Sequence, residues 1–161
     1  MRVALIADTH FRVGGIELPK RCIKEIRASD LLLHAGDISV GEALKEIESL
    51  GPPVHSVHGN VDSPQLQRRL PEQLSVELEG IVIAMLHDAG PAGGRLQRMR
   101  ARFPEADVVV FGHSHMPLDE KDNGFRIFNP GSPTQRRRSP SHTMGVAEIT
   151  GDRTSFRHVE V

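Results

Sequence analysis

The sequence predicts an α/β fold in which two β-sheets pack face to face and helices cover their outer faces. Short apolar runs rich in β-branched residues recur along the 161 residues, which favours strands over helices. Longer amphipathic segments separate the first three runs, and such strand–helix alternation predicts parallel pairing. After Pro71 the pattern changes to a hairpin, and the final quarter of the chain is mainly of β type, which predicts the second sheet.

Seven apolar runs are the predicted strands. Val76–Leu78 is expected to pair with the fourth of them across a turn at Glu79-Gly80, which would form the hairpin. The seven predicted strands are Val3–Ala7, Leu31–Leu33, Val54–Val57, Ile81–Leu86, Val108–Phe111, Phe125–Phe128 and Met144–Ile149.

Four helices are predicted between the strands. The first has Pro19 in its first turn. In the second, Ser39 is the expected N-cap and Glu42 completes a capping box, while Gly51-Pro52-Pro53 ends the helix. The arginines of the last helix are expected on its solvent face. The other two helices are predicted at Pro64–Leu70 and Ala92–Arg102.

The composition argues against several classes of protein. The length suits one hydrophobic core and no linker or repeat interrupts it, so we expect a single domain over residues 1–161. A formal net charge of −1 provides no general nucleic-acid-binding surface. One cysteine, Cys22, rules out an internal disulfide framework, and no apolar stretch approaches the roughly 20 residues that span a membrane. The first apolar run is too short for a signal peptide, so we expect a cytoplasmic protein.

Five of the predicted strands end in polar residues of the kinds that bind metals. In open α/β sheets, ligands bind outside the carboxyl ends of the strands, so these side chains are expected to gather at one edge. The candidate ligands are Asp8, His10, Asp37, Asn60, His87, His113 and His115.

Local spacing supports this set of ligands. Asp8 and His10 are two residues apart, so an extended backbone would direct both to one face, and His113 and His115 repeat the spacing. A glycine also precedes several candidates, where it permits a positive φ that turns the next side chain over the strand ends. These glycines are Gly36, Gly59 and Gly112.

Seven oxygen and nitrogen ligands are too many for one ion and suit two. A carboxylate can bridge two metals, and Asp37 on the second strand is the expected bridge. The absence of thiolate among the ligands suits Mn, Fe, Zn, Ni or Co. Two divalent cations add +4 and the two aspartates return −2, so a bridging hydroxide would leave +1 to attract phosphate. Two metals roughly 3.5–4 Å apart suit an in-line displacement at phosphorus.

These motifs resemble those of the calcineurin-like metallophosphoesterase family, most closely its small single-domain prokaryotic phosphodiesterase branch. The similarity covers essentially the whole chain and ends in Asn129-Pro130-Gly131-Ser132. The resemblance implies a four-layer α/β/β/α fold. It implies one metal on Asp8, His10, Asp37 and His115. It implies a second metal on the expected catalytic residues, which are Asp37, Asn60, His87 and His113.

Two positions depart from the larger family. A histidine that donates a proton to the leaving group often follows Gly-Asn in that family, whereas Val61-Asp62 stands here, as in the small branch. Asp88 replaces a glycine that commonly follows the histidine matching His87. We expect Asp62 and Asp88 to contact the substrate or to support the metal ligands.

Other polar residues give weaker signals. His34 is expected to be a buried residue that orients Asp37 or His10 rather than a ligand. His58 is expected to be similar, with contact to phosphate as the alternative. Arg136-Arg137-Arg138 could hold a substrate phosphate or an RNA backbone, although a solvated loop is the favoured interpretation.

Together these features predict a metal-dependent phosphodiesterase that hydrolyses small phosphodiesters through a metal-bridging hydroxide. Manganese is the first choice of metal, with Fe, Zn, Ni and Co as alternatives. Two other functions stay open: a non-catalytic protein-interaction scaffold, since the retromer scaffold subunit resembles this branch, and a nuclease. The complete ligand set favours the enzyme, because that scaffold has lost part of it. The expected partner is a small phosphodiester. No membrane association is expected, nucleic acid is a disfavoured partner, and a homo-oligomer stays open.

Overall fold

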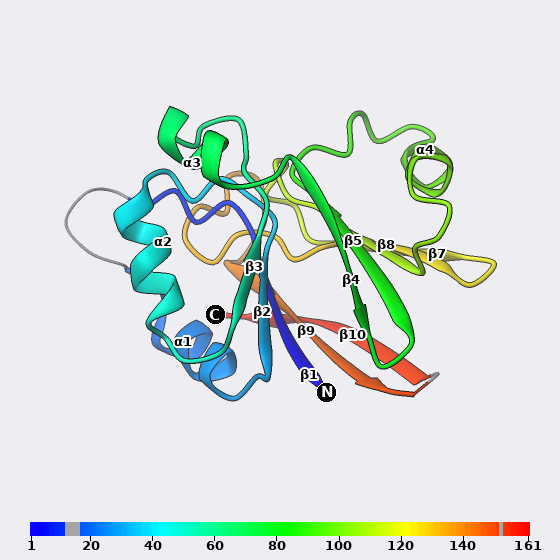
Figure 1. Ribbon diagram of the computed structural model, residues 1–161, viewed down its shortest axis with the longest axis horizontal. Coiled ribbons are helices and arrows are strands. Elements are labelled where there is room, and N and C mark those ends of the chain that lie inside the picture. Colours follow the sequence, from blue (N-terminus) through cyan, green and yellow to red (C-terminus); the bar gives the residue numbers. More distant parts are fainter. Residues whose placement is uncertain (12–16, 152) are drawn as a thin grey trace.

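The computed structural model describes residues 1–11, 17–151 and 153–161. Within these residues, ten strands form two five-stranded mixed sheets that pack face to face (Figure 1). The first sheet has the spatial order β10 (Arg153–Glu160), β9 (Thr143–Thr150), β1 (Arg2–Ile6), β2 (Leu31–His34) and β3 (Val54–Ser56). The second has the order β4 (Gln73–Leu78), β5 (Ile81–Leu86), β6 (Val108–Val110), β8 (Phe125–Asn129) and β7 (Leu118–Asp122).

Helices cover both outer faces, so the layers are α/β/β/α as predicted (Figure 1). Ile26, Leu44 and Leu66 pack their helices against the first sheet, and Leu96 and Met99 pack another helix against the second. The helices are α1 (Lys20–Arg27), α2 (Gly41–Glu48), α3 (Pro64–Arg69) and α4 (Arg95–Arg102). In the described ranges, no helix has the length and apolar character needed to cross a membrane.

Strand β1 shows why a central strand is a continuous apolar run in the sequence. Val3 and Leu5 belong to the core between the sheets, whereas Ala4 and Ile6 belong to the core beneath the helices. All four are fully buried. Burial of a large aliphatic side chain contributes about 1.5–3 kcal/mol, so both faces of β1 stabilise the fold and no polar face remains to produce alternation.

Three helices start differently from the prediction, and in α1 the difference is that Pro19 is the N-cap and not part of the first turn. Helix α2 follows Val40 without a side-chain cap, so the predicted Ser39 capping box is wrong. Ser39 has φ 100°, and its N–H donates to Asp62 Oδ1 at 2.5 Å, which commits Ser39 to the loop before the helix. Helix α4 begins at Arg95, later than predicted, because Gly94 precedes it in the left-handed conformation with φ 67°.

Strands β7 and β10 lie outside the predicted apolar runs. Each is at the edge of its sheet, and each carries exposed charged residues such as Lys121 and Arg157. Edge strands commonly carry charges, which discourage pairing with another chain. The seven strands predicted from apolar runs are confirmed.

The carboxyl ends of β1, β2, β3, β5 and β6 meet at one rim of the two sheets. Strands β1, β2 and β3 are parallel neighbours, and so are β5 and β6. His87 Nδ1, just after β5, lies 2.8 Å from the carbonyl oxygen of Ala35, just after β2. The His113 N–H, after β6, donates to Asp8 Oδ1, after β1, at 3.2 Å. These contacts join the two sheets where the polar residues follow the strands.

Candidate metal centre

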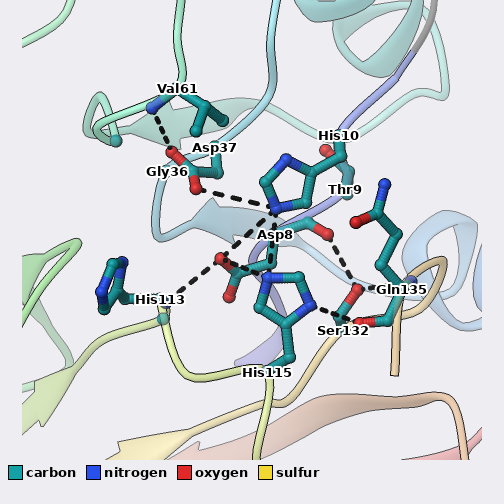
Figure 2. Close-up of polar contacts among 12 residues, drawn as sticks. Asp8, Thr9, His10, Gly36, Asp37, Val61, His113, His115, Ser132 and Gln135 are labelled. Carbon is teal, nitrogen blue, oxygen red and sulfur yellow. Dashed lines mark hydrogen bonds and ion pairs between the residues drawn. The ribbon is translucent and has the colours of Figure 1, made fainter. Parts of the chain in front are cut away.

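The structure brings all seven predicted ligands together at this rim, and Figure 2 labels five of them: Asp8, His10, Asp37, His113 and His115. Their role as metal ligands stays a prediction. Asp8, His10 and His115 form the first group, in which Asp8 and His115 are buried and His10 is half-buried. His115 Nε2 lies 3.3 Å from Asp8 Oδ1, and His10 Nε2 lies 3.1 Å from His115 Nε2. The donor atoms of the three residues lie within 4.8 Å of one another, which could hold one ion.

Asp8, Asp37 and His87 form a second group that shares Asp8 with the first. His87 Nε2 lies 3.2 Å from Asp37 Oδ2 and 3.9 Å from Asp8 Oδ1. Asp37 Oδ2 also lies 3.7 Å from His10 Nε2. Both carboxylates therefore face both groups, and the assignment of Asp37 as the bridge stays a prediction.

Asn60 and His113 complete the centre on its open side. His113 Nδ1 lies 3.0 Å from Asn60 Oδ1, and its ring meets that of His87 edge to face, with centroids 5.3 Å apart. The side chain of His113 is 44% exposed, whereas that of His115 is 0% exposed. A substrate can therefore reach this side of the centre.

Five of the seven residues have left-handed backbone conformations: Asp8 (φ 55°), His10 (45°), Asp37 (60°), His113 (69°) and His115 (58°). The prediction that an extended backbone aligns the two spaced pairs is therefore wrong. Left-handed conformations of residues with side chains cost on the order of 1–3 kcal/mol each and concentrate at functional sites. Their clustering at this rim is independent support for a functional role.

The glycines before the ligands serve the centre in two ways. Gly36 has φ 90°, as predicted. Gly59 and Gly112 are outside the positive-φ region, so the predicted turn is wrong at both positions. A Cβ on Gly59 would lie 2.0 Å from Asp37 Oδ1, and one on Gly112 would lie 2.9 Å from Asp8 Oδ2. These two glycines are required because the carboxylates pack directly against their backbone.

Backbone carbonyls determine which nitrogen of two histidines faces the centre. Nδ1 of His115 donates to the carbonyl of Gln135 (Figure 2), and Nδ1 of His87 donates to the carbonyl of Ala35. A carbonyl only accepts, so Nδ1 carries the proton and Nε2 of each ring is available to a metal. Metal-binding histidines are commonly oriented in this way.

Burial and neighbouring charges perturb the titration of the group members. Burial raises the pKa of Asp8 to about 7, opposed mainly by the charge of His87. Burial lowers the pKa of His115 to about 4 and also lowers the pKa of His10, so both rings are neutral at pH 7. For His87, burial acts to lower the pKa, but interaction with Asp37 and the charge of Asp8 outweigh it and raise the pKa.

The residues present fit a divalent cation. Asp8 Oδ2 is buried and has no hydrogen-bond partner among the described residues, and a buried polar atom without a partner costs about 1–3 kcal/mol. Nε2 of His115 carries no proton and lies 3.3 Å from Asp8 Oδ1, so two lone pairs face each other at a distance that suits a cation between them. Oxygen and imidazole donors without thiolate suit Mn, Fe, Zn, Ni or Co.

Asp62 supports the ligand loops. Its buried carboxylate accepts the N–H groups of Asp37 (3.1 Å), Ser39 (2.5 Å) and Gly59 (2.7 Å). Of the two roles expected for Asp62, the geometry agrees with support and not with contact to a substrate. The carboxylate connects the loop that carries Asp37 to the loop that carries Asn60.

His34 supports a different residue from those predicted. It is fully buried, and burial lowers its pKa to about 3, so the ring is neutral. Its Nδ1 accepts the Gly36 N–H at 3.2 Å, which leaves the proton on Nε2 to donate to Thr9 Oγ1 at 3.0 Å. His34 thus holds the residue between two ligands, and the predicted hydrogen bond to Asp37 or His10 is wrong.

His58 and Asp88 line a pocket of about 270 Å³ on the open side of the centre. Asn60 and His87 line the same pocket, so it adjoins the second group. Arg102 also lines it, which the sequence did not predict because the helix pattern placed this arginine on a solvent face. This position agrees with the substrate contact expected for Asp88 and with the alternative, phosphate contact, for His58; both roles stay predictions.

The pocket arginine is held at the start of β4, by Gln73 and the residue before it. Arg102 Nη2 donates to Gln73 Oε1 at 2.8 Å and lies 3.5 Å from Glu72 Oε1. Both partners are distant from Arg102 in sequence, so no local pattern could indicate them.

The C-terminal loop holds the first group in place. Ser132 Oγ donates to the carbonyl of Asp8 at 2.8 Å, and Thr134 Oγ1 donates to the carbonyl of Thr9 at 2.7 Å. Gln135 accepts from His115 in the same loop. The resemblance of Asn129–Ser132 to the family loop was the only sequence signal for these contacts.

Comparison with known proteins agrees with this geometry. The model of the calcineurin-like phosphoesterase superfamily domain matches residues 1–152. A probable metallophosphoesterase of Methanothermobacter thermautotrophicus is 32% identical over 155 residues, which cover 95% of this chain and 88% of that protein.

Two solved structures have the same fold. An archaeal phosphodiesterase superposes with a TM-score of 0.79 at 20% identity and covers 100% of both chains. Vps29 from Entamoeba histolytica, complexed with Zn²⁺, superposes with a TM-score of 0.77 at 19% identity and covers 99% of both chains. These similarities establish the fold, while the family rests on the domain match and the archaeal relative. The chain therefore belongs to the calcineurin-like phosphoesterase superfamily.

Proposed function

We propose that the protein is a phosphodiesterase that hydrolyses small phosphodiesters at a site for two divalent cations, with manganese as the expected metal. The observation that supports this best is the pair of donor groups that share Asp8 and are both faced by Asp37. Family membership supports a phosphoester substrate. The seven oxygen and nitrogen donors support two ions, because they exceed one coordination sphere.

When bound, two such cations activate water and stabilise the attacking and leaving oxygens of an in-line displacement. The chain's own residues prepare the site for that chemistry. His10 and His115 are neutral and present lone pairs, while Asp8 and Asp37 supply the negative charge that attracts cations. Backbone contacts of His87 and His115 keep both rings oriented before metal arrives.

No side chain at the position after Gly-Asn can donate a proton to the leaving group. Val61 is exposed and its N–H donates to Asp37 Oδ1 at 3.0 Å (Figure 2), but its side chain is apolar. The Asp62 carboxylate already accepts three backbone N–H groups. The departing oxygen must therefore be stabilised by the cations or by its own acidity. If a donor exists, His58 in the adjoining pocket is the first candidate.

The pocket beside Asn60 and His87 supports a small organic group on the substrate. Its volume of about 270 Å³ is slightly below that of pockets for drug-sized molecules, which are about 300–1,000 Å³. A single aromatic ring or a short alkyl chain on one ester oxygen fits this size. We place the leaving group there because the phosphate must lie at the metal centre.

A protein-interaction scaffold is the second candidate, because Vps29 shares the fold. A scaffold has no need of a buried carboxylate oxygen without a partner or of five left-handed residues at one rim. Both features destabilise the folded chain when no metal is bound, and both are explained by metal binding. Because the Vps29 structure also holds Zn²⁺, these features support a metal site, and the match to the phosphoesterase family favours the enzyme.

The proposal is tested with protein stripped of metal and reloaded with Mn²⁺. Metal content is counted, and hydrolysis is measured for aryl and alkyl phosphodiesters of graded leaving-group pKa, with monoesters and nucleotides in parallel. We expect two ions per chain, hydrolysis only in the loaded protein, and rates that increase steeply with leaving-group acidity. A stoichiometry of one or less in excess Mn²⁺ would contradict the two-metal site, and loaded protein without any hydrolysis would favour the scaffold.

A further inference from the structure

The structure separates the three consecutive arginines of the C-terminal loop. Arg136 Nη1 donates to the carbonyls of Ser139 (3.3 Å) and Pro140 (3.0 Å), so it is bound to its own loop. Arg138 is exposed and has no hydrogen bond or ion pair to any described residue. Arg137 Nη1 donates to the carbonyl of His113 at 3.3 Å. Only the middle arginine of the three thus contacts a residue of the metal centre.

The position of Arg137 is set by the loop that precedes it. Ser132 and Gln135 bind this loop to the segments that carry Asp8 and His115. Arg137 itself has φ 47°, a left-handed conformation of the kind found at five of the predicted ligands. Such a conformation needs support from its surroundings, and here it directs the side chain back to the carbonyl of His113.

The guanidinium of Arg137 lies beside the predicted ligand His113, because it contacts the backbone of that residue. It is also exposed, and the contact with His113 uses one of its five N–H donors.

We propose that Arg137 binds a non-bridging oxygen of the substrate phosphate and so holds the phosphodiester against the metal centre from the His113 side. The inference rests on the proposed function for its substrate. A guanidinium suits this task because it is always charged and its planar donors match phosphate oxygens. The phosphomonoester product and inorganic phosphate present the same kind of non-bridging oxygens, so we expect both to bind the Arg137 guanidinium.

The test measures the affinity of full-length, Mn²⁺-loaded protein for inorganic phosphate by calorimetry, with metal content measured in every variant. Arg137→Gln removes the charge and keeps a polar side chain, while Ser132 and Gln135 still hold the loop in place. We expect it to weaken phosphate binding about tenfold, which corresponds to about 1.4 kcal/mol. Arg137→Lys keeps the charge without the planar donors, and we expect an intermediate loss. Arg138→Gln is the matched control, with less than about a twofold change.

Unchanged phosphate affinity in Arg137→Gln would overturn the inference. Equal losses in Arg137→Gln and Arg138→Gln would also overturn it, because they would show a general effect of loop charge. Hydrolysis is measured on the same samples to separate the two proposals. Wild-type protein that hydrolyses diesters, with Arg137→Gln equal to it in kcat/KM and phosphate affinity, would leave the function intact and remove Arg137. If the wild-type protein does not hydrolyse diesters, but only Arg137→Gln shows the tenfold loss of phosphate affinity, the phosphate-binding role of Arg137 stands and the proposed function does not.

Discussion

The two halves of the metal centre differ in how firmly the fold holds them. The inner half is the first group, in which Asp8 and His115 are fully buried and each is bound by the C-terminal loop. The outer half is the second group with Asn60 and His113, and these last two residues are solvent-accessible and contact each other at 3.0 Å. Pre-organised donors lose little freedom when they bind an ion, whereas mobile donors must be ordered. We therefore expect the inner half to bind metal more tightly, and the outer half to adjust to the substrate.

The largest expected effect is at the two aspartates that both halves share. Loss of groups that only orient a ligand typically costs about 10–100-fold, so Asp8→Asn and Asp37→Asn should each lower kcat/KM by more than about 100-fold. Asp8→Asn should also reduce metal content in both halves, since Asp8 belongs to both donor groups. Asp122→Asn, in the exposed β7–β8 hairpin, is the control. Near-wild-type turnover of Asp37→Asn with full metal content would refute its role.

The next largest effect is on metal binding, at one histidine from each half. His115→Ala should remove the more tightly bound ion, and His113→Ala should weaken only the second, by about tenfold or more. A Mn²⁺ titration of metal-free protein should show two steps in the wild type. His113→Ala should lose the weaker step and His115→Ala the stronger one. If both variants lost the same step, the two halves would not be separate metal sites.

The gathering of the predicted ligands at one rim was predictable because the signal is local. Five of the apolar runs are followed within four residues by a predicted ligand, as in Ile6-Ala7-Asp8 and Val110-Phe111-Gly112-His113. Parallel strands place these ends at one rim. The layer order was predictable for the same reason, since strand and helix periodicities are visible within short windows.

The support of the ligands was not predictable, because it depends on contacts between distant loops. His34 bonds to Thr9 rather than to a ligand, and Ser132 bonds to Asp8 across most of the chain. The left-handed conformation of Asp37 depends on loop contacts that the fold imposes, including its N–H bond to Asp62. The capping pattern at Ser39 failed because the same carboxylate binds its N–H instead.

A third prediction tests the electrostatic cost of the inner half. The ordinary pKa of Asp8 is 3.8, and burial raises the folded value to about 7. The folded metal-free chain therefore binds more protons than the unfolded chain between these values, and stability from this group falls as pH increases through that window. Metal-free Asp8→Asn should gain thermal stability relative to metal-free wild type from pH 5 to pH 8, by about 2–4 °C per kcal/mol.

The order of these two proteins should reverse with Mn²⁺ present, because the ion stabilises only the chain with the carboxylate. Differential scanning fluorimetry across the pH series, with and without metal, measures both effects. A stability difference that does not change with pH in metal-free protein would show that Asp8 has an ordinary pKa.

The smallest expected effect is at Ser132, which holds the inner half without facing the ion. Ser132→Ala removes the hydrogen bond to the Asp8 carbonyl, and its hydroxyl also accepts the Gln135 N–H at 2.9 Å. One net hydrogen bond contributes about 0.5–1.5 kcal/mol, so the melting temperature should fall by about 2–4 °C. The affinity for the tighter ion should fall by about fivefold or less. Ser141→Ala, which removes an exposed hydroxyl bonded to Glu160, is the matched control. Should Ser132→Ala weaken only the second ion, the C-terminal loop would support the outer half, and the proposed difference between the halves would be incorrect.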